Sequence, residues 1–101
     1  MSLYNIDWIH RSAEVFYWVR KDLRNKGYGQ KALLKLLRLG FSKYNLHRIE
    51  AKLGYNNMPS KKILDHLNFR LEGRLREKYL NNGVYYDALI YSLLESDNNK
   101  L

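Results

Sequence analysis

The chain has 101 residues, enough for one domain and too few for two, and its 46% of hydrophobic residues favour a packed core over disorder. The absence of cysteine excludes disulfides, a thiolate zinc site and a cysteine nucleophile. No apolar run approaches the roughly 20 residues of a membrane span, and no signal-peptide pattern is found, so we expect a cytoplasmic location without membrane contact. Of the net charge of +8, residues 20–43 carry +7, from eight basic residues and Asp22, which predicts an anionic partner unless this is simply a solvated helix face.

The first half of the chain predicts two strands followed by a helix. Residues 3–6 are compatible with the end of a strand, and residues 13–19 are rich in the β-branched and aromatic types that favour strands. In residues 30–44 leucine and aromatic side chains recur at spacings of three and four, with basic side chains elsewhere on the helical wheel. This periodicity predicts an amphipathic helix.

The second half predicts a strand, a short helix and a β-hairpin. Residues 47–53 alternate between apolar and charged types, which is typical of a half-buried strand. Asn57 is a suitable cap for a helix that ends near Leu67, and residues 69–79 and 84–94 predict two strands joined by an Asn-Gly turn. The fold class is therefore α+β, with two helices in a domain of residues 1–95, and the polar residues 96–101 are expected to form a flexible tail.

The loop Arg24-Asn25-Lys26-Gly27-Tyr28-Gly29 is the most informative local pattern. It joins a strand to the start of a helix, where unpaired N–H groups and glycines favour phosphate. A Walker loop is excluded because no Gly-Lys-Ser/Thr ending follows, and a dinucleotide fingerprint is disfavoured because Ala32 occupies the position of its third glycine and no further parallel strand follows. A plain tight turn is the structural alternative.

The same loop resembles the acetyl-coenzyme A signature of the GNAT superfamily of N-acetyltransferases, in the form Arg24-x-x-Gly27-x-Gly29. The resemblance spans about Leu3 to Leu94. Within the superfamily, the sequence is similar to the branch that acetylates the amino termini of ribosomal proteins. The resemblance implies a truncated GNAT fold with a mixed, mostly antiparallel sheet, in which the amino-terminal part of full members is missing. Further matching blocks are Gln30-Lys31-Ala32-Leu33, His47-Arg48-Ile49-Glu50-Ala51, Asn57-x-x-Ser60, Leu67-Asn68-Phe69-Arg70-x-Glu72-Gly73 and Asn82-Gly83-x-Tyr85-x-Asp87.

The resemblance implies that the chain binds acetyl-CoA as its cosubstrate, needs no metal and acts on an amine acceptor. Two residues of the first half would lie beside the pantetheine arm, backbone amides of the loop would hold the pyrophosphate, and two residues after the third strand would face the cofactor. In chain order these implied cofactor residues are Trp18, Val19, Arg24, Asn25, Lys26, Gly27, Tyr28, Gly29, Gln30, Asn57 and Ser60.

Acetyl transfer needs a neutral amine and a proton for the leaving thiolate. A protein α-amine, with a pKa of about 7.7–8.0, is neutral at pH 7 far more often than a lysine with a pKa of about 10.4, so a protein amino terminus is one candidate acceptor. Glu50 is the candidate base, acting through water, with a surface ion pair as its structural alternative and Glu14 in reserve. Ser60 is the candidate partner of the thiol, with helix capping as its alternative, and Leu64 stands where some family members carry a tyrosine acid.

Two other functions compete with N-acetyltransferase activity. The first is a non-catalytic coenzyme-A-binding module. It is favoured because the missing amino-terminal part would, in full family members, supply one wall of the groove for the acceptor. A small RNA-binding domain is suggested by the nine tyrosines and the positive charge, but nucleic acid is disfavoured because the basic residues gather on the loop and helix rather than among the aromatic residues. A homodimer is expected, because a second copy would cover the exposed strand edge and the aromatic strand around Phe16.

Overall fold

The computed structural model describes residues 2–16 and 28–98, apart from the side chains of Phe16 and Tyr28. Within these residues the chain forms five strands and three helices. They are β1 (Ser2–Asp7), β2 (Ser12–Phe16), α1 (Tyr28–Ser42), β3 (Arg48–Gly54), α2 (Met58–His66), β4 (Arg70–Asn81), β5 (Val84–Leu94) and α3 (Glu95–Asn98).

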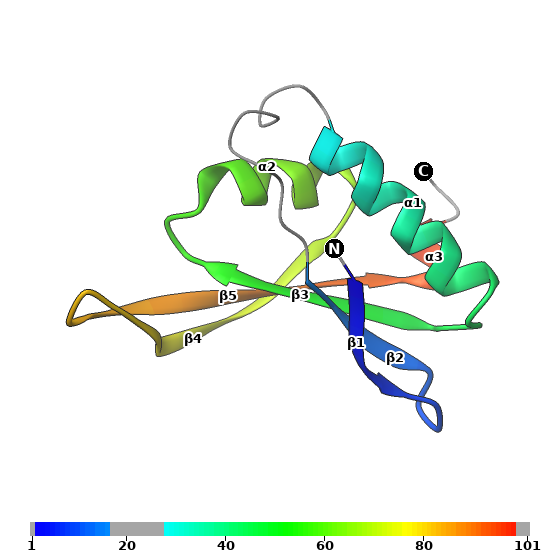
Figure 1. The fold of residues 1–101 in the computed structure, drawn as a ribbon, viewed down its shortest axis with the longest axis horizontal. Coiled ribbons are helices and arrows are strands. Elements are labelled where there is room, and N and C mark those ends of the chain that lie inside the picture. The colour runs from blue at the N-terminus through cyan, green and yellow to red at the C-terminus, as the bar shows by residue number, and fades with distance from the viewer. Residues whose placement is uncertain (1, 17–27, 99–101) are drawn as a thin grey trace.

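The strands form one mixed sheet in the order β1-β2-β3-β5-β4, and α1 and α2 cover the same face of it (Figure 1). Neighbouring strands are antiparallel except β2 and β3, which are parallel. The predicted α+β class and the mostly antiparallel sheet are therefore confirmed. No helix in the described part of the chain is long and apolar enough to cross a membrane.

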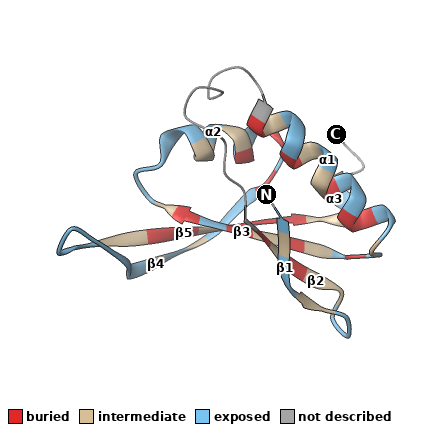
Figure 2. Cartoon of the chain, viewed as in Figure 1, coloured by how far each residue is buried: buried red, intermediate tan, exposed pale blue. Residues whose placement is uncertain are grey.

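Helix α1 packs one apolar stripe onto the sheet, and Figure 2 shows its buried positions on the side that faces the strands. Leu33, Leu37 and Phe41, four residues apart, are all buried. A Cβ atom at Gly40 would lie 3.1 Å from Cδ1 of Ile49, so glycine lets the helix approach the sheet closely here.

The predicted turns and caps lie where the residue types indicated. The side chain of Asn57 accepts a hydrogen bond from the backbone N–H of Ser60 at 3.3 Å, which caps α2. Asn82 and Gly83 have φ angles of 52° and 76°, so both central residues of the β4–β5 turn are left-handed, as a tight hairpin requires. The Asn57 cap and the Asn-Gly hairpin are thus confirmed.

The end of the chain differs from the expectation. Residues 95–98 form α3, so the described residues contain three helices where the sequence predicted two, while the flexible tail from residue 96 stays a prediction. Asp97 is buried because its carboxylate accepts the backbone N–H of Leu94 at 3.1 Å and pairs with Arg70 at 3.5 Å. A polar composition predicts a solvated tail only when no such partner lies nearby. Residues 99–101 lie outside the described residues.

Candidate functional site

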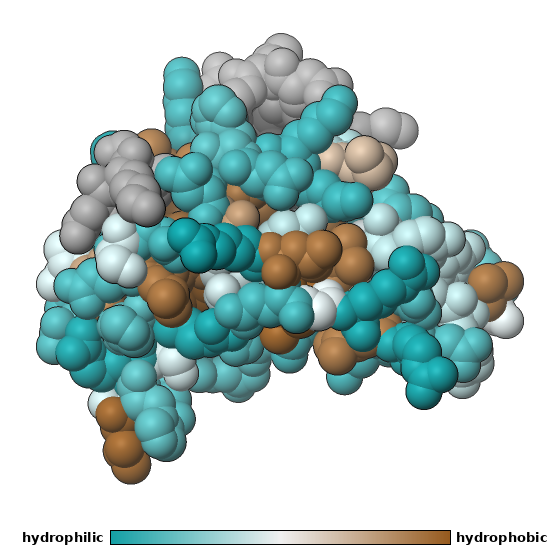
Figure 3. All heavy atoms as spheres, turned by 180° about the vertical axis from the view of Figure 1, so that it is seen from behind, coloured by the Kyte–Doolittle hydropathy of each residue, from teal (hydrophilic) through white to brown (hydrophobic). Residues whose placement is uncertain are grey.

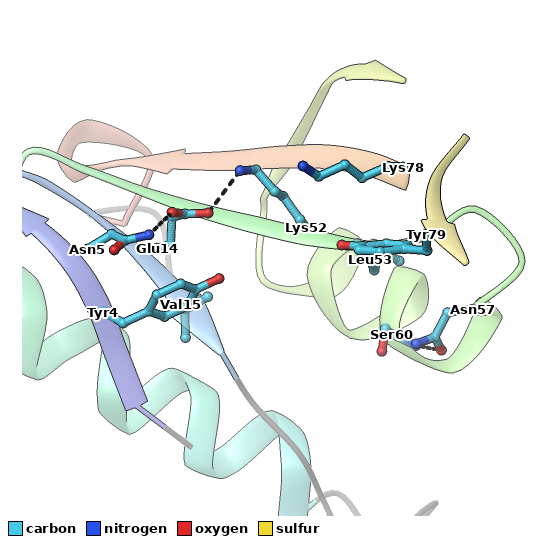
Figure 4. Close-up of a pocket in the computed structure, with 10 residues that line it drawn as sticks. All are labelled: Tyr4, Asn5, Glu14, Val15, Lys52, Leu53, Asn57, Ser60, Lys78 and Tyr79. Atoms are coloured by element: carbon cyan, nitrogen blue, oxygen red, sulfur yellow. Dashed lines mark hydrogen bonds and ion pairs between the residues drawn. The ribbon is translucent and has the colours of Figure 1, made fainter. Parts of the chain in front are cut away.

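The site begins where β2 and β3 diverge. The two strands pair in parallel from Ser12–Arg48 to Glu14–Glu50. Among the described residues the pairing stops there. A pocket of about 600 Å³ opens beyond this point (Figure 4). Its described lining comes from β1 (Tyr4, Asn5), β2 (Glu14, Val15), β3 (Lys52, Leu53), the start of α2 (Asn57, Ser60) and β4 (Lys78, Tyr79).

Strand alternation gives the pocket two chemically different sides. Val15 and Leu53 belong to the buried core beneath the helices, so they form an apolar wall on the helix side. Glu14 and Lys52 are their neighbours in sequence and therefore point to the opposite face of the sheet. The gap between β2 and β3 thus connects an apolar side with a charged side.

The carboxylate of Glu14 is held by two partners. Asn5 Nδ2 donates a hydrogen bond to it at 2.7 Å, and Lys52 Nζ lies 3.0 Å from its other oxygen. The hydrogen bond from Asn5 and the Lys52 ammonium lower the pKa of Glu14, and the hydrogen bond that Lys52 itself makes with Glu14 raises the pKa of Lys52. Both side chains are therefore charged at neutral pH.

Two tyrosines flank this charged side. Figure 4 shows the rings of Tyr4 and Tyr79 entering from opposite sides of the pocket, with their hydroxyl groups pointing toward one another. Desolvation and the negative charge of Glu14 raise the pKa of Tyr4. Its hydroxyl therefore stays protonated at neutral pH and can donate a hydrogen bond.

Glu50 lies beside the pocket without lining it. It is the register neighbour of Glu14, and Arg48 lies 3.5 Å from its carboxylate, as in the ion-pair alternative raised above. Arg48 also binds Glu72, which accepts a hydrogen bond from Ser92 Oγ at 2.7 Å. These contacts lower the pKa of Glu72 to about 2, and they connect β3, β4 and β5 outside the pocket lining.

Asn57 and Ser60 both line the pocket, on its helix side. Leu64, one turn further along α2, is fully buried in the core and lies outside the lining. The first turn of α1 contains Tyr28, Gly29 and Gln30, of which Gly29 is buried. The other implied cofactor residues lie outside the described residues: Trp18, Val19, Arg24, Asn25, Lys26 and Gly27.

Sequence reasoning missed seven of the described lining residues: Tyr4, Asn5, Val15, Lys52, Leu53, Lys78 and Tyr79. Only Lys52 carried a signal, because it lies on the charged face of its strand. Strand β4 is separated from β3 by β5, and its pairing with β5 shifts register before Tyr79. Such an irregularity redirects side chains in a way that no alternation pattern predicts.

Comparison with known proteins links most of the chain to one family. The model of the family described as "Acetyltransferase (GNAT) domain" matches residues 1–90. YdaF of Bacillus subtilis (strain 168), which carries the provisional name ribosomal N-acetyltransferase, is 32% identical over 96% of this chain and 53% of its own length. The spermidine N(1)-acetyltransferase of Vibrio cholerae is 29% identical over 95% of this chain and 56% of its own length.

Solved structures agree with this match. A variant of the spermidine N-acetyltransferase SpeG from Vibrio cholerae superposes with a TM-score of 0.91 at 29% identity, covering 95% of this chain and 57% of that one. The chain thus spans about half the length of the curated relatives and solved structures that it matches.

Proposed function

Because the chain belongs to the family of GNAT acetyltransferase domains, we propose that it transfers an acetyl group from acetyl-CoA to a primary amine. The observation that carries the proposal is the pocket at the divergence of β2 and β3. It offers an apolar wall on one side and an ionised carboxylate, Glu14, on the other. A thioester and an amine could therefore meet in the gap between the two strands.

The helix side of the pocket fits the cofactor chemically. Val15 and Leu53 suit the alkyl parts of a pantetheine arm, and Asn57 and Ser60 bring polar groups to the same side. Backbone N–H groups in the first turn of α1 favour an anion by about 0.3–1 kcal/mol, which suits a pyrophosphate near Gly29. The roles implied for residues 18–27 stay predictions.

Acetyl-CoA, when bound, supplies a thioester whose carbonyl carbon forms the new C–N bond as its C–S bond breaks. We propose that Glu14, rather than Glu50, accepts a hydrogen bond from the acceptor amine and orients it, because Glu14 lines the pocket. The amine proton passes to water beside this carboxylate. Ser60 remains the proposed hydrogen-bond donor to the leaving sulfur. The thiolate takes its proton from the Ser60 hydroxyl, which is then reprotonated by water, or directly from solvent.

The proposed acceptor is a protein α-amine. Since its partners lower the pKa of Glu14, this carboxylate is a weak base and cannot neutralise a strongly basic amine efficiently. An α-amine, with a pKa of about 7.7–8.0, is already partly neutral at pH 7 and needs little help. The spermidine acceptor named for some relatives is the competing amine class.

Acetyl-CoA is expected to raise the melting temperature of the protein by about 10–20 °C, because a ligand at about 100 times its dissociation constant adds about 2.7 kcal/mol. The measurement is differential scanning fluorimetry, followed by an assay of thiol release with peptide amines. No shift at saturating acetyl-CoA contradicts the proposed function. A shift without thiol release above background instead supports the non-catalytic coenzyme-A-binding module.

We also propose that the chain forms a homodimer through β1. This strand is an edge of the sheet and pairs only with β2 among the described residues. Its turn to β2 exposes Trp8 and Ile9, with 63% and 88% of their surfaces accessible, and Figure 3 shows apolar atoms at this tip. Edge strands beside apolar surface favour pairing with another chain.

Light scattering is therefore expected to give twice the monomer mass of 12.1 kDa. Ile9→Lys should shift the equilibrium toward monomer without loss of fold, because this side chain makes almost no contact within the chain. A monomer mass that does not change with concentration would rule out the dimer.

The cytoplasmic location expected from the sequence stays a prediction.

A further inference from the structure

The charged side of the pocket carries information about the acceptor. Its described lining has three charged side chains: Glu14, Lys52 and Lys78. Glu14 is already satisfied, with Lys52 Nζ at 3.0 Å and Asn5 Nδ2 at 2.7 Å. The negative charge of this carboxylate and the positive charge of the Lys52 ammonium cancel. The pair therefore contributes no net charge to the pocket.

Lys78 supplies the remaining charge. It is exposed, and it makes no ion pair with any residue in the described ranges 2–16 and 28–98. Figure 4 shows its ammonium on the same side of β3 as that of Lys52. One carboxylate and two ammonium groups give the described lining a net charge of +1.

Nearby carboxylates pair with arginines rather than with Lys78. Glu50 and Glu72 lie outside the pocket lining, and both contact Arg48. Asp87 pairs with Arg74 and accepts the backbone N–H of Glu77. Each of these carboxylates pairs with an arginine and none pairs with Lys78, so the Lys78 ammonium has no ion-pair partner among the described residues.

We propose that the acceptor is a peptide amino terminus followed by acidic residues, whose carboxylates pair with Lys78 while the α-amine meets Glu14. The inference rests on the acetyl transfer proposed above. A polyamine is disfavoured, because its additional ammonium groups would need unpaired carboxylates and the described lining has none. The acidic side chains would instead replace water around an ammonium that has no ion-pair partner in residues 2–16 and 28–98.

The test compares two peptides that begin with the same serine and continue with either two glutamates or two lysines, with spermidine as a third acceptor. The assay of thiol release is expected to give a kcat/KM about tenfold higher for the acidic than for the basic peptide. The Lys78 ammonium attracts the glutamates of the first peptide and repels the lysines of the second. Added salt should shrink this ratio. A preference for spermidine or for the basic peptide overturns the inference.

Variants separate the role of Lys78 from the net charge of the protein. Lys78→Glu should abolish or invert the preference while leaving the acetyl-CoA melting shift unchanged. Arg38→Glu, the same charge change on the exposed side of α1, should keep the preference. An unchanged ratio in Lys78→Glu contradicts the inference.

Binding provides a readout that does not depend on turnover. With coenzyme A present, fluorescence anisotropy of the two labelled peptides should show tighter binding of the acidic one, and Lys78→Glu should remove the difference. Equal affinities overturn the acceptor inference. If no amine is acetylated but the acidic peptide still binds more tightly, the proposed acetyl transfer fails and the peptide selectivity stands.

Discussion

Replacing Leu37 by alanine is expected to lower the free energy of unfolding by about 2–5 kcal/mol. Leu37 is fully buried on the inner side of α1 and belongs to the same core cluster as Ile49 and Leu93. The substitution removes apolar contacts and leaves a cavity that the surrounding strands can fill only in part. For a domain of 101 residues this is a large share of a typical total of about 5–15 kcal/mol.

Leu39 offers a matched control two residues away. Its side chain is 39% exposed on the same helix, so Leu39→Ala is expected to cost less than about 1 kcal/mol. Urea denaturation followed by circular dichroism measures both variants. Equal losses for the two leucines would contradict the assignment of the buried face of α1.

Glu14→Gln is expected to lower kcat/KM for peptide acetylation about 100-fold. The amide keeps the shape of the side chain but loses the negative charge that orients the acceptor amine, and it leaves the Lys52 ammonium without its 3.0 Å partner. The acetyl-CoA melting shift should persist, because the apolar wall of the pocket is unchanged. Steady-state thiol release against peptide concentration measures the effect.

Glu50→Gln is the natural comparison for this variant. Glu50 is the register neighbour of Glu14 but lies outside the pocket lining, with Arg48 beside it. We expect its kcat/KM to stay within about threefold of the parent, as for the loss of one partly exposed ion pair. If Glu50→Gln causes the larger loss, Glu50 is the functional carboxylate, as the sequence first indicated.

Much of the secondary structure could be predicted because its causes are local. The leucine spacing of α1, the Asn57 cap of α2 and the left-handed Asn82-Gly83 turn all depend on residues within a few positions of one another. The family could also be identified from sequence, because its matching blocks follow one another in order along the chain. Both conclusions need no knowledge of which distant segments touch.

Local sequence patterns could not decide which of two carboxylates, Glu14 or Glu50, lines the pocket. Strand alternation places Glu14 and Glu50 on the same face of the sheet, and their pairing makes them neighbours. The choice between them depends on where β2 separates from β3, which is a property of two segments more than 30 residues apart. The pairing of Lys52 with Glu14, and the approach of Lys78 from β4, depend on the same separation.

By itself, then, the amino-acid sequence determined the order of the elements before α3, the caps and turns, and the family. The tertiary structure alone decided that Glu14 rather than Glu50 lines the pocket, that Lys78 adds an unpaired charge there among the described residues, and that Asp97 folds α3 against Arg70. The physical reason is the same in each case. Hydrogen bonds and ion pairs between residues far apart in sequence form only when the sheet brings their strands together, and sequence periodicity carries no record of them.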